Sequence, residues 1–189
     1  GCAIFPPDNA WNTPVDALPV HPHSADLVGV VSLGADAIHP DFGSTWTYNG
    51  KTYKMGIPIT VVPSTQPLVK VDFANGYWDE SDRVAGKKFG MYPFPSNAAV
   101  EGGGDRHVLV LQKGPASDAS SCTLWETYAS TYVSSTSSWT AMSGATFNLS
   151  SNAMRPLGWT SADAAGLAIL PGLVRYEETY ESPNPINHA

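Results

Sequence analysis

Apolar and polar residues alternate over several short segments of the chain. The segment 45–55 alternates on both sides of Asn49 and Gly50, a pair that suits the two positive-φ positions of a tight turn, and it predicts a β-hairpin. Short runs of β-branched and aromatic residues, bounded by Gly, Pro or Ser, predict further strands. These runs are 57–62, 68–73, 108–112, 123–132, 138–149 and 173–176.

Helices are expected to be few, because the sixteen prolines and seventeen glycines interrupt helical hydrogen bonding or cost backbone entropy. Apolar residues at helical spacing predict a helix over 24–32, with Ser24 as its cap. A second short helix is expected over 161–165, in which Asp163 completes a capping box with Thr160. This capping role argues against a catalytic role for Asp163.

Together these elements predict an all-β fold, an antiparallel β-sandwich or jelly roll with one or two short helices. The 189 residues fit a single domain, 1–189, and 42% of them are hydrophobic, so a substantial core is expected. Only 14% are charged, which leaves much of the surface polarity to Ser, Thr, Asn and Gly.

Charge and cysteine content narrow the partners and the compartment. A net charge of −7, without a cluster of Lys and Arg, argues against nucleic acid and anionic membranes, and no apolar run approaches the roughly 18 residues of a membrane-spanning helix. The chain opens at Gly1 without an initiator Met or a leader, as expected for the mature form of a secreted protein. There, Cys2 and Cys122 most simply form a disulfide, with two buried thiols as the alternative. Asn148 begins a glycosylation acceptor pattern.

Several segments together resemble a family of secreted bacterial and fungal proteins of unsettled activity. The matching segments are 8–14 (DNAWNTP), 39–43 (HPDFG), 56–58 (GIP), 79–82 (DESD), 101–107 (EGGGDRH), 124–126 (LWE) and 155–176 (RPLGWTSADAAGLAILPGLVRY). The resemblance implies an extracellular protein but no particular activity. Members of that family continue past the segment that resembles 186–189. This implies that the chain is shortened and that its own cleaved C-terminal segment would be a partner completing the sheet or the site.

The densest polar cluster runs from Glu101 to His107, in a glycine-rich loop that leads into the apolar segment 108–111. Asp105 offers an acid or base, Arg106 a fixed cation, and His107 a group that titrates near neutrality. Because glycines let a loop approach a ligand closely, these three are expected to be catalytic and Glu101 to bind ligand. In the alternative, Asp105 caps a turn or pairs with Arg106, and Arg106 satisfies loop carbonyls.

His39 and Asp41 stand two residues apart on a segment stiffened by Pro40. In an extended backbone both side chains point the same way, as metal ligands or an acid and base pair require. Together with Asp105 and His107 they form a set that could bind a divalent cation. In the alternative, Asp41 bonds the backbone of a turn and His39 lies on the surface.

Two further groups of residues are candidates for ligand binding or catalysis. Trp78 could stack on a sugar ring while Asp79 and Glu80 bond its hydroxyls, although a solvated acidic loop is the alternative. Glu126 lies on a predicted strand, on the face opposite to Trp125. On the concave face of a jelly roll it would be a catalytic acid, and on the outer face it would simply be exposed.

We therefore predict a secreted enzyme that cleaves the glycosidic bonds of a polysaccharide. Aromatic and acidic residues on a Ser- and Thr-rich fold suit an uncharged polymer better than a charged one. Two of Asp41, Asp105 and Glu126 would act as general acid and as base or nucleophile.

Three alternatives remain open. In a polysaccharide lyase, Arg106 would neutralise a uronate carboxylate and His107 or His39 would abstract the neighbouring proton. In a non-catalytic, lectin-like module, aromatic residues would stack on sugars and acids would hold a structural Ca²⁺. A purely structural protein would have no coherent pocket.

Overall fold

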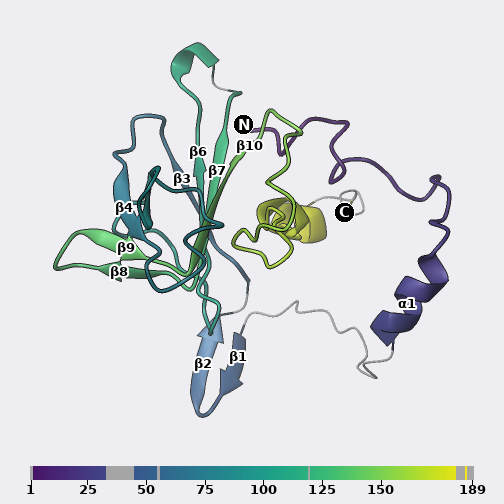
Figure 1. Ribbon diagram of the computed structural model, residues 1–189, viewed down its shortest axis with the longest axis horizontal. Helices are drawn as coiled ribbons and strands as arrows, with labels where there is room; N and C mark the ends of the chain where they lie inside the picture. Colours follow the sequence, from purple (N-terminus) through teal and green to yellow (C-terminus); the bar gives the residue numbers. More distant parts are fainter. Residues whose placement is uncertain (1, 33–44, 55, 119, 182–185, 187–189) are drawn as a thin grey trace.

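The computed structural model describes residues 2–32, 45–54, 56–118, 120–181 and 186. Most of the regular structure is β-strand, arranged in two four-stranded sheets and a separate hairpin (Figure 1). The predicted all-β, sandwich-like fold with few and short helices is confirmed. Each four-stranded sheet contains one parallel pair, so the sheets are mixed rather than antiparallel throughout.

The first sheet has the strand order β10-β7-β6-β3. Its strands are β10 (Ser143–Asn148), β7 (Thr123–Tyr128), β6 (Val108–Gln112) and β3 (Ile59–Val62). The pairs β10–β7 and β6–β7 are antiparallel, whereas β3 runs parallel to β6. This register places Glu126 between Leu109 on one neighbouring strand and Ala145 on the other.

The second sheet has the order β5-β4-β9-β8, and the hairpin stands apart from both sheets. The strands of the sheet are β5 (Phe89–Tyr92), β4 (Val69–Asp72), β9 (Ser138–Thr140) and β8 (Thr131–Val133). The hairpin joins β1 (Thr45–Tyr48) to β2 (Lys51–Lys54). Asn49 and Gly50 take φ values of 49° and 73°, as predicted for its turn.

Two apolar cores lie on opposite faces of the first sheet. On β6, Val108 and Val110 pack into a cluster shared with the second sheet, while Leu109 between them belongs to the other cluster. This second cluster contains Phe5 from the N-terminal segment and Leu170 from the C-terminal one. Figure 1 shows the corresponding arrangement, with the first sheet between the second sheet and the chain that follows β10. The first sheet is therefore covered by apolar side chains on both faces.

The predicted disulfide between Cys2 and Cys122 is present, with a Cα–Cα distance of 5.8 Å. Cys122 is fully buried directly before β7, and Cys2 packs against the second apolar core. The bond therefore attaches the N-terminal segment to the first sheet.

The predicted helix 24–32 is confirmed as α1 (Ser24–Ser32). Its apolar residues Leu27, Val28 and Val31 remain more than half exposed, and Figure 1 shows the helix well apart from the sheets. The described residues also form three short helical segments: η1 (Ala116–Asp118), η2 (Leu170–Gly172) and the π-helical η3 (Glu177–Glu181). None of the described helices has the length and apolar character needed to cross a bilayer.

Two predicted elements are wrong. The segment 161–165 forms turns. The Asp163 carbonyl accepts the N–H of Ser161, which precedes it in the chain, and the N–H of Gly166, only three residues later. Neither contact is the bond of an α-helix, in which a carbonyl accepts the N–H four residues later. The segment 173–176 is not a strand, because the Leu173 N–H turns back to the Leu170 carbonyl.

Other strand boundaries also differ from the prediction. The predicted strand 123–132 is broken after β7 at Ala129, which has a φ of 54°, and 138–149 is divided into β9 and β10. The strand β5 was not predicted, since Gly90 interrupts its apolar pattern.

Candidate functional site

A cavity of about 690 Å³ opens where the loop 101–107 meets the segments 77–80 and 160–164. Its wall combines acids, tyrosines and apolar side chains. The described lining residues are Ile57, Tyr77, Glu80, Asp105, His107, Tyr128, Ser143, Thr160, Ala162, Asp163, Ala164 and Ile169. Asp105, His107 and Glu80 are sequence-predicted site residues, and the structure brings them together here.

His107 is held at both ring nitrogens. Its Nδ1 lies 2.6 Å from Glu101 Oε2, and its Nε2 lies 3.2 Å from the Ala162 carbonyl oxygen. A carboxylate and a carbonyl only accept hydrogen bonds, so the ring makes both contacts when both nitrogens are protonated. The Tyr128 ring lies beside it at a centroid distance of 5.6 Å.

The charges around His107 favour this protonated form. Burial alone would lower the pKa of His107, but the hydrogen bond and charge of Glu101, the Ala162 carbonyl and the charge of Asp105 together raise it above 6.5. Burial likewise opposes ionisation of Glu101, yet its bonds to the side chain and backbone of His107 lower the pKa of this carboxyl. The pair is therefore an imidazolium bound to a carboxylate.

The glycine-rich loop is closed by this pair and by the backbone. The Glu101 N–H donates to the His107 carbonyl, and the His107 N–H donates to Glu101 Oε2. At Gly102 a side chain would meet the Lys54 carbonyl oxygen at 2.6 Å, so the close approach of β2 requires glycine. The loop thus holds a fixed conformation at the mouth of the cavity.

Asp105 and Arg106 separate at this loop. The Asp105 carboxylate is exposed, lines the cavity and makes no hydrogen bond to the described residues. Arg106 has a φ of 50°, and its Nε donates to the Ser130 carbonyl at 3.0 Å. It is not among the described lining residues, so its geometry matches the alternative in which it satisfies a loop carbonyl.

Glu126 lies behind the cavity wall rather than on an open face. Its side chain is fully buried on the second core; both oxygens accept the Ile169 N–H, at 3.1 and 2.9 Å, and Oε1 also accepts the Leu170 N–H at 2.9 Å. Burial raises the pKa of Glu126 to about 7, against the two N–H donors and the charge of His107, while Asp163 adds to the rise. Neither predicted placement of this residue, concave or exposed, is correct.

The residues of the acidic segment 77–80 do not all face the cavity. Tyr77 is 51% exposed and lines the cavity, while the exposed Asp79 is not among its described lining residues. Trp78 packs against the first core, and the cations of Arg83 and Lys88 each lie 4.9 Å from its ring centroid. The Trp78 ring is therefore occupied, and within this segment Tyr77 is the aromatic residue that lines the cavity.

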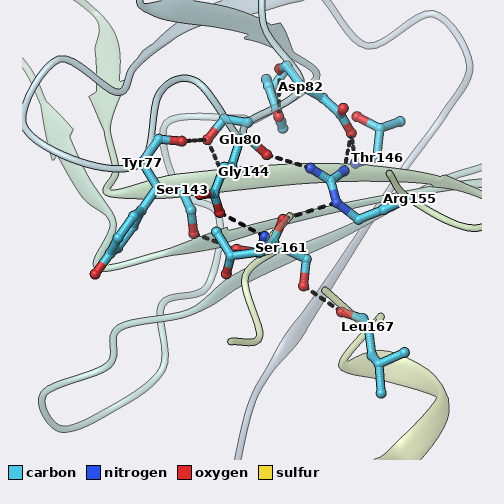
Figure 2. A network of polar contacts seen from close by, with 12 residues as sticks. Tyr77, Glu80, Asp82, Ser143, Gly144, Thr146, Arg155, Ser161 and Leu167 are labelled. Carbon is cyan, nitrogen blue, oxygen red and sulfur yellow. Dashed lines mark hydrogen bonds and ion pairs between the residues drawn. The ribbon is translucent and has the colours of Figure 1, made fainter. Parts of the chain in front are cut away.

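A buried arginine ties this segment to the chain that follows β10 (Figure 2). Arg155 donates to Asp82 Oδ2 at 2.6 Å, to the Glu80 carbonyl at 2.7 Å and to the Thr160 carbonyl at 3.1 Å. Glu80 Oε2 in turn accepts the Thr160 N–H at 2.9 Å. Figure 2 shows the Tyr77 ring extending away from these bonds. The network fixes two walls of the cavity relative to each other.

Sequence reasoning missed Asp163 and Tyr128 as lining residues. Asp163 follows Ala162, whose carbonyl contacts His107, and its Oδ2 accepts the Ala165 N–H at 2.9 Å. The resemblance of the segment 155–176 to the family could have indicated Asp163, but the predicted capping role argued against a place in the site. Tyr128 could have been found from its place at the end of β7, beside the start of β6.

His39 and Asp41 lie outside the described residues, so the predicted four-residue metal site stays a prediction. Among the residues that the structure describes, no three His, Cys, Asp or Glu side chains are grouped to hold a metal ion. Asn148 is exposed, and its Oδ1 accepts the Ser150 N–H. Its glycosylation also stays a prediction.

The arrangement offers sugar-sized space, two tyrosine rings and three carboxylates around a fixed imidazolium. Such a concave site with converging polar groups is the usual place for a small ligand or a polymer segment. The chain matches no protein-family model, no curated protein and no solved structure.

Proposed function

We propose that the protein is a secreted carbohydrate-active enzyme that binds a polysaccharide in this cavity and cleaves its glycosidic bonds. One observation carries the proposal: Tyr77 and Tyr128 line the same cavity as Glu80, Asp105 and Asp163. Tyrosine rings stack on the apolar faces of sugars, and carboxylates accept hydrogen bonds from their hydroxyls. The disulfide is compatible with an extracellular location.

Asp105 and Asp163 are the two carboxylates that we assign to the reaction. They reach the cavity from two sides of His107, Asp105 from the glycine-rich loop and Asp163 from the segment whose Ala162 carbonyl contacts the imidazole. One carboxyl group protonates the leaving glycosidic oxygen. The other attacks the anomeric carbon or removes a proton from the attacking water, and the anomer of the product tells which.

Glu126 is excluded from direct contact with substrate by its burial, so it replaces neither residue of this pair. Its function here is to hold the N–H groups of Ile169 and Leu170, and Ile169 lines the cavity. A lyase with Arg106 and His107 as its catalytic groups has less support. Arg106 bonds the Ser130 carbonyl, and both nitrogens of His107 have acceptors.

The test is the release of reducing ends from a panel of neutral, cationic and anionic polysaccharides. Asp105→Asn and Asp163→Asn should each lower kcat by about 10²–10⁴-fold, the usual contribution of an acid or base catalyst. Asp16→Asn, at an exposed acid that is not among the described lining residues of this cavity, should leave kcat unchanged. Azide added to Asp105→Ala and Asp163→Ala identifies a nucleophile or base by restoring turnover.

Two results would reject the proposal. If the wild-type protein binds a polysaccharide without cleaving it, a lectin-like module replaces the enzyme. If cleavage occurs and both Asn variants retain full kcat, the reaction takes place elsewhere in the molecule.

A further inference from the structure

The wall of the cavity is strongly negative for its size. Its titratable lining residues include three acids, Glu80, Asp105 and Asp163, and one imidazole, His107. No lysine or arginine appears among the described lining residues. All ten Lys and Arg of the chain fall within the described ranges, since the remaining positions contain neither residue type by sequence.

The imidazolium does not neutralise these acids, because it already has a partner. Glu101 binds the His107 Nδ1 at 2.6 Å, and the side chains of the two residues are only 17% and 11% exposed. The pair is therefore neutral as a unit. The carboxyl groups of Glu80, Asp105 and Asp163 therefore have no cation among the described residues that line the cavity. The general acid of the proposed reaction is protonated, so two negative charges remain on the wall.

Each of these carboxylates still has lone pairs for a ligand. Glu80 accepts one backbone N–H from Thr160, Asp163 accepts one from Ala165, and Asp105 accepts none from the described residues. A carboxylate offers about four acceptor sites, so one N–H leaves most of them free. The acids can thus receive several hydrogen bonds from a cationic group.

We propose that the substrate is a polysaccharide of amino sugars with free ammonium groups. This inference rests on the proposed function. An ammonium group donates three hydrogen bonds and is attracted by the charge of the wall. Tyrosine rings also attract cations, and Tyr77 and Tyr128 line the same cavity. A uronate or sulfated polymer would meet like charge. Composition alone suggested an uncharged polymer, and the charge of the cavity shifts that expectation to a cationic one.

The experiment compares oligomers of glucosamine, N-acetylglucosamine and galacturonic acid of matched length, by binding and by cleavage. Glucosamine oligomers should show the lowest Kd and the highest kcat/KM, and galacturonic acid oligomers the weakest binding. Raising the salt from about 0.01 M to about 1 M shortens the Debye length from about 30 Å to about 3 Å. This should weaken glucosamine binding and leave N-acetylglucosamine binding nearly unchanged.

Glu80→Gln removes one charge while keeping an oxygen for the Thr160 N–H. It should raise the Kd for glucosamine oligomers by about fivefold more than the Kd for N-acetylglucosamine oligomers, as expected for a unit charge about 4 Å away in water. Asp16→Asn removes the same charge outside the cavity and should change neither value. If Glu80→Gln is unstable, the salt dependence of the wild-type protein decides alone.

Three results separate the inference from its premise. Preference for glucosamine that is lost in Glu80→Gln supports the inference. Cleavage of N-acetylglucosamine or another neutral oligomer at equal or higher kcat/KM, with no salt dependence, overturns the cationic substrate and leaves the enzyme standing. Absence of both binding and cleavage for every oligomer overturns the proposed function as well.

Discussion

Replacing the buried Glu126 by glutamine should remove the part of the pH dependence of the free energy of unfolding that arises from Glu126. The pKa of Glu126 rises from 4.5 to about 7 on folding, chiefly because burial disfavours the carboxylate. Between these two values the folded protein binds more protons than the unfolded chain. Its free energy of unfolding therefore falls as the pH rises through this window.

The size of the effect follows from the two pKa values. At about 1.4 kcal/mol for each tenfold change in proton affinity, the stabilisation lost between pH 4.5 and pH 8 is about 3 kcal/mol. Glutamine cannot titrate, and its side-chain oxygen can still accept the N–H groups of Ile169 and Leu170. Glu126→Gln should therefore lack this fall, and its stability relative to wild type should improve by about 3 kcal/mol across the window.

Urea denaturation of both proteins, followed by tryptophan fluorescence at several pH values from 4.5 to 8, measures the difference. Subtracting one protein from the other cancels the titration of groups that are common to both and do not interact with Glu126. Glu126→Ala serves as a second variant, because it leaves two buried N–H groups without an acceptor and should cost about 2–6 kcal/mol at pH 5. If the free energies of unfolding of wild type and Glu126→Gln change in parallel with pH, the raised pKa of Glu126 is refuted.

Three further predictions concern bonds that hold the site together. Replacing Cys2 and Cys122 by serine should lower the free energy of unfolding by about 4–5 kcal/mol, since the disulfide closes a 120-residue separation, and a change below about 1 kcal/mol in urea denaturation would contradict this. Arg155→Met should lower the free energy of unfolding by about 3–5 kcal/mol in urea denaturation, because Asp82 and two carbonyls lose a buried donor, and Arg155→Lys should recover only part of that loss in the same assay. Glu101→Gln should lower the pKa of His107 toward or below 6.5, as measured by NMR titration. The wild-type pair stabilises the folded protein at low pH, and this stabilisation is lost as the pH rises through the raised pKa of His107; Glu101→Gln should remove it. An unchanged midpoint of the His107 NMR titration would show that Glu101 does not raise the pKa of His107.

Local patterns predicted the elements whose cause is local. The strand β6 (Val108–Gln112) was predicted to the residue, because an unbroken apolar run suits a strand buried on both faces. The hairpin followed from Asn49 and Gly50, whose positive φ values are intrinsic preferences. The helix predicted over 161–165 is absent because the Asp163 carbonyl accepts the N–H of Ser161, two residues earlier, together with the hydroxyls of Thr160 and Ser161, and this local pattern replaces helical hydrogen bonding.

The candidate site was only partly predictable for a different reason. The glycine-rich loop shows the proximity of Asp105 and His107 directly in the sequence. The partners of Glu126 and His107 are remote: Ile169 lies 43 residues after Glu126, and Ala162 lies 55 residues after His107. Alternation along a strand predicts which face a side chain takes, and it contains no information about which distant backbone group will meet it there.

The disulfide between Cys2 and Cys122 also determines what a protease can release. A single cut anywhere between residues 3 and 121 leaves both fragments covalently joined, because the two cysteines close a ring over that stretch. Residues 155–181, which include Arg155 and Asp163, lie beyond this ring. After a cut between Cys122 and residue 155, only packing and hydrogen bonds hold them to the rest of the protein. Under oxidising conditions, nicking within the ring should leave one band on a non-reducing gel, whereas a cut beyond Cys122 can separate a C-terminal fragment that bears one wall of the cavity.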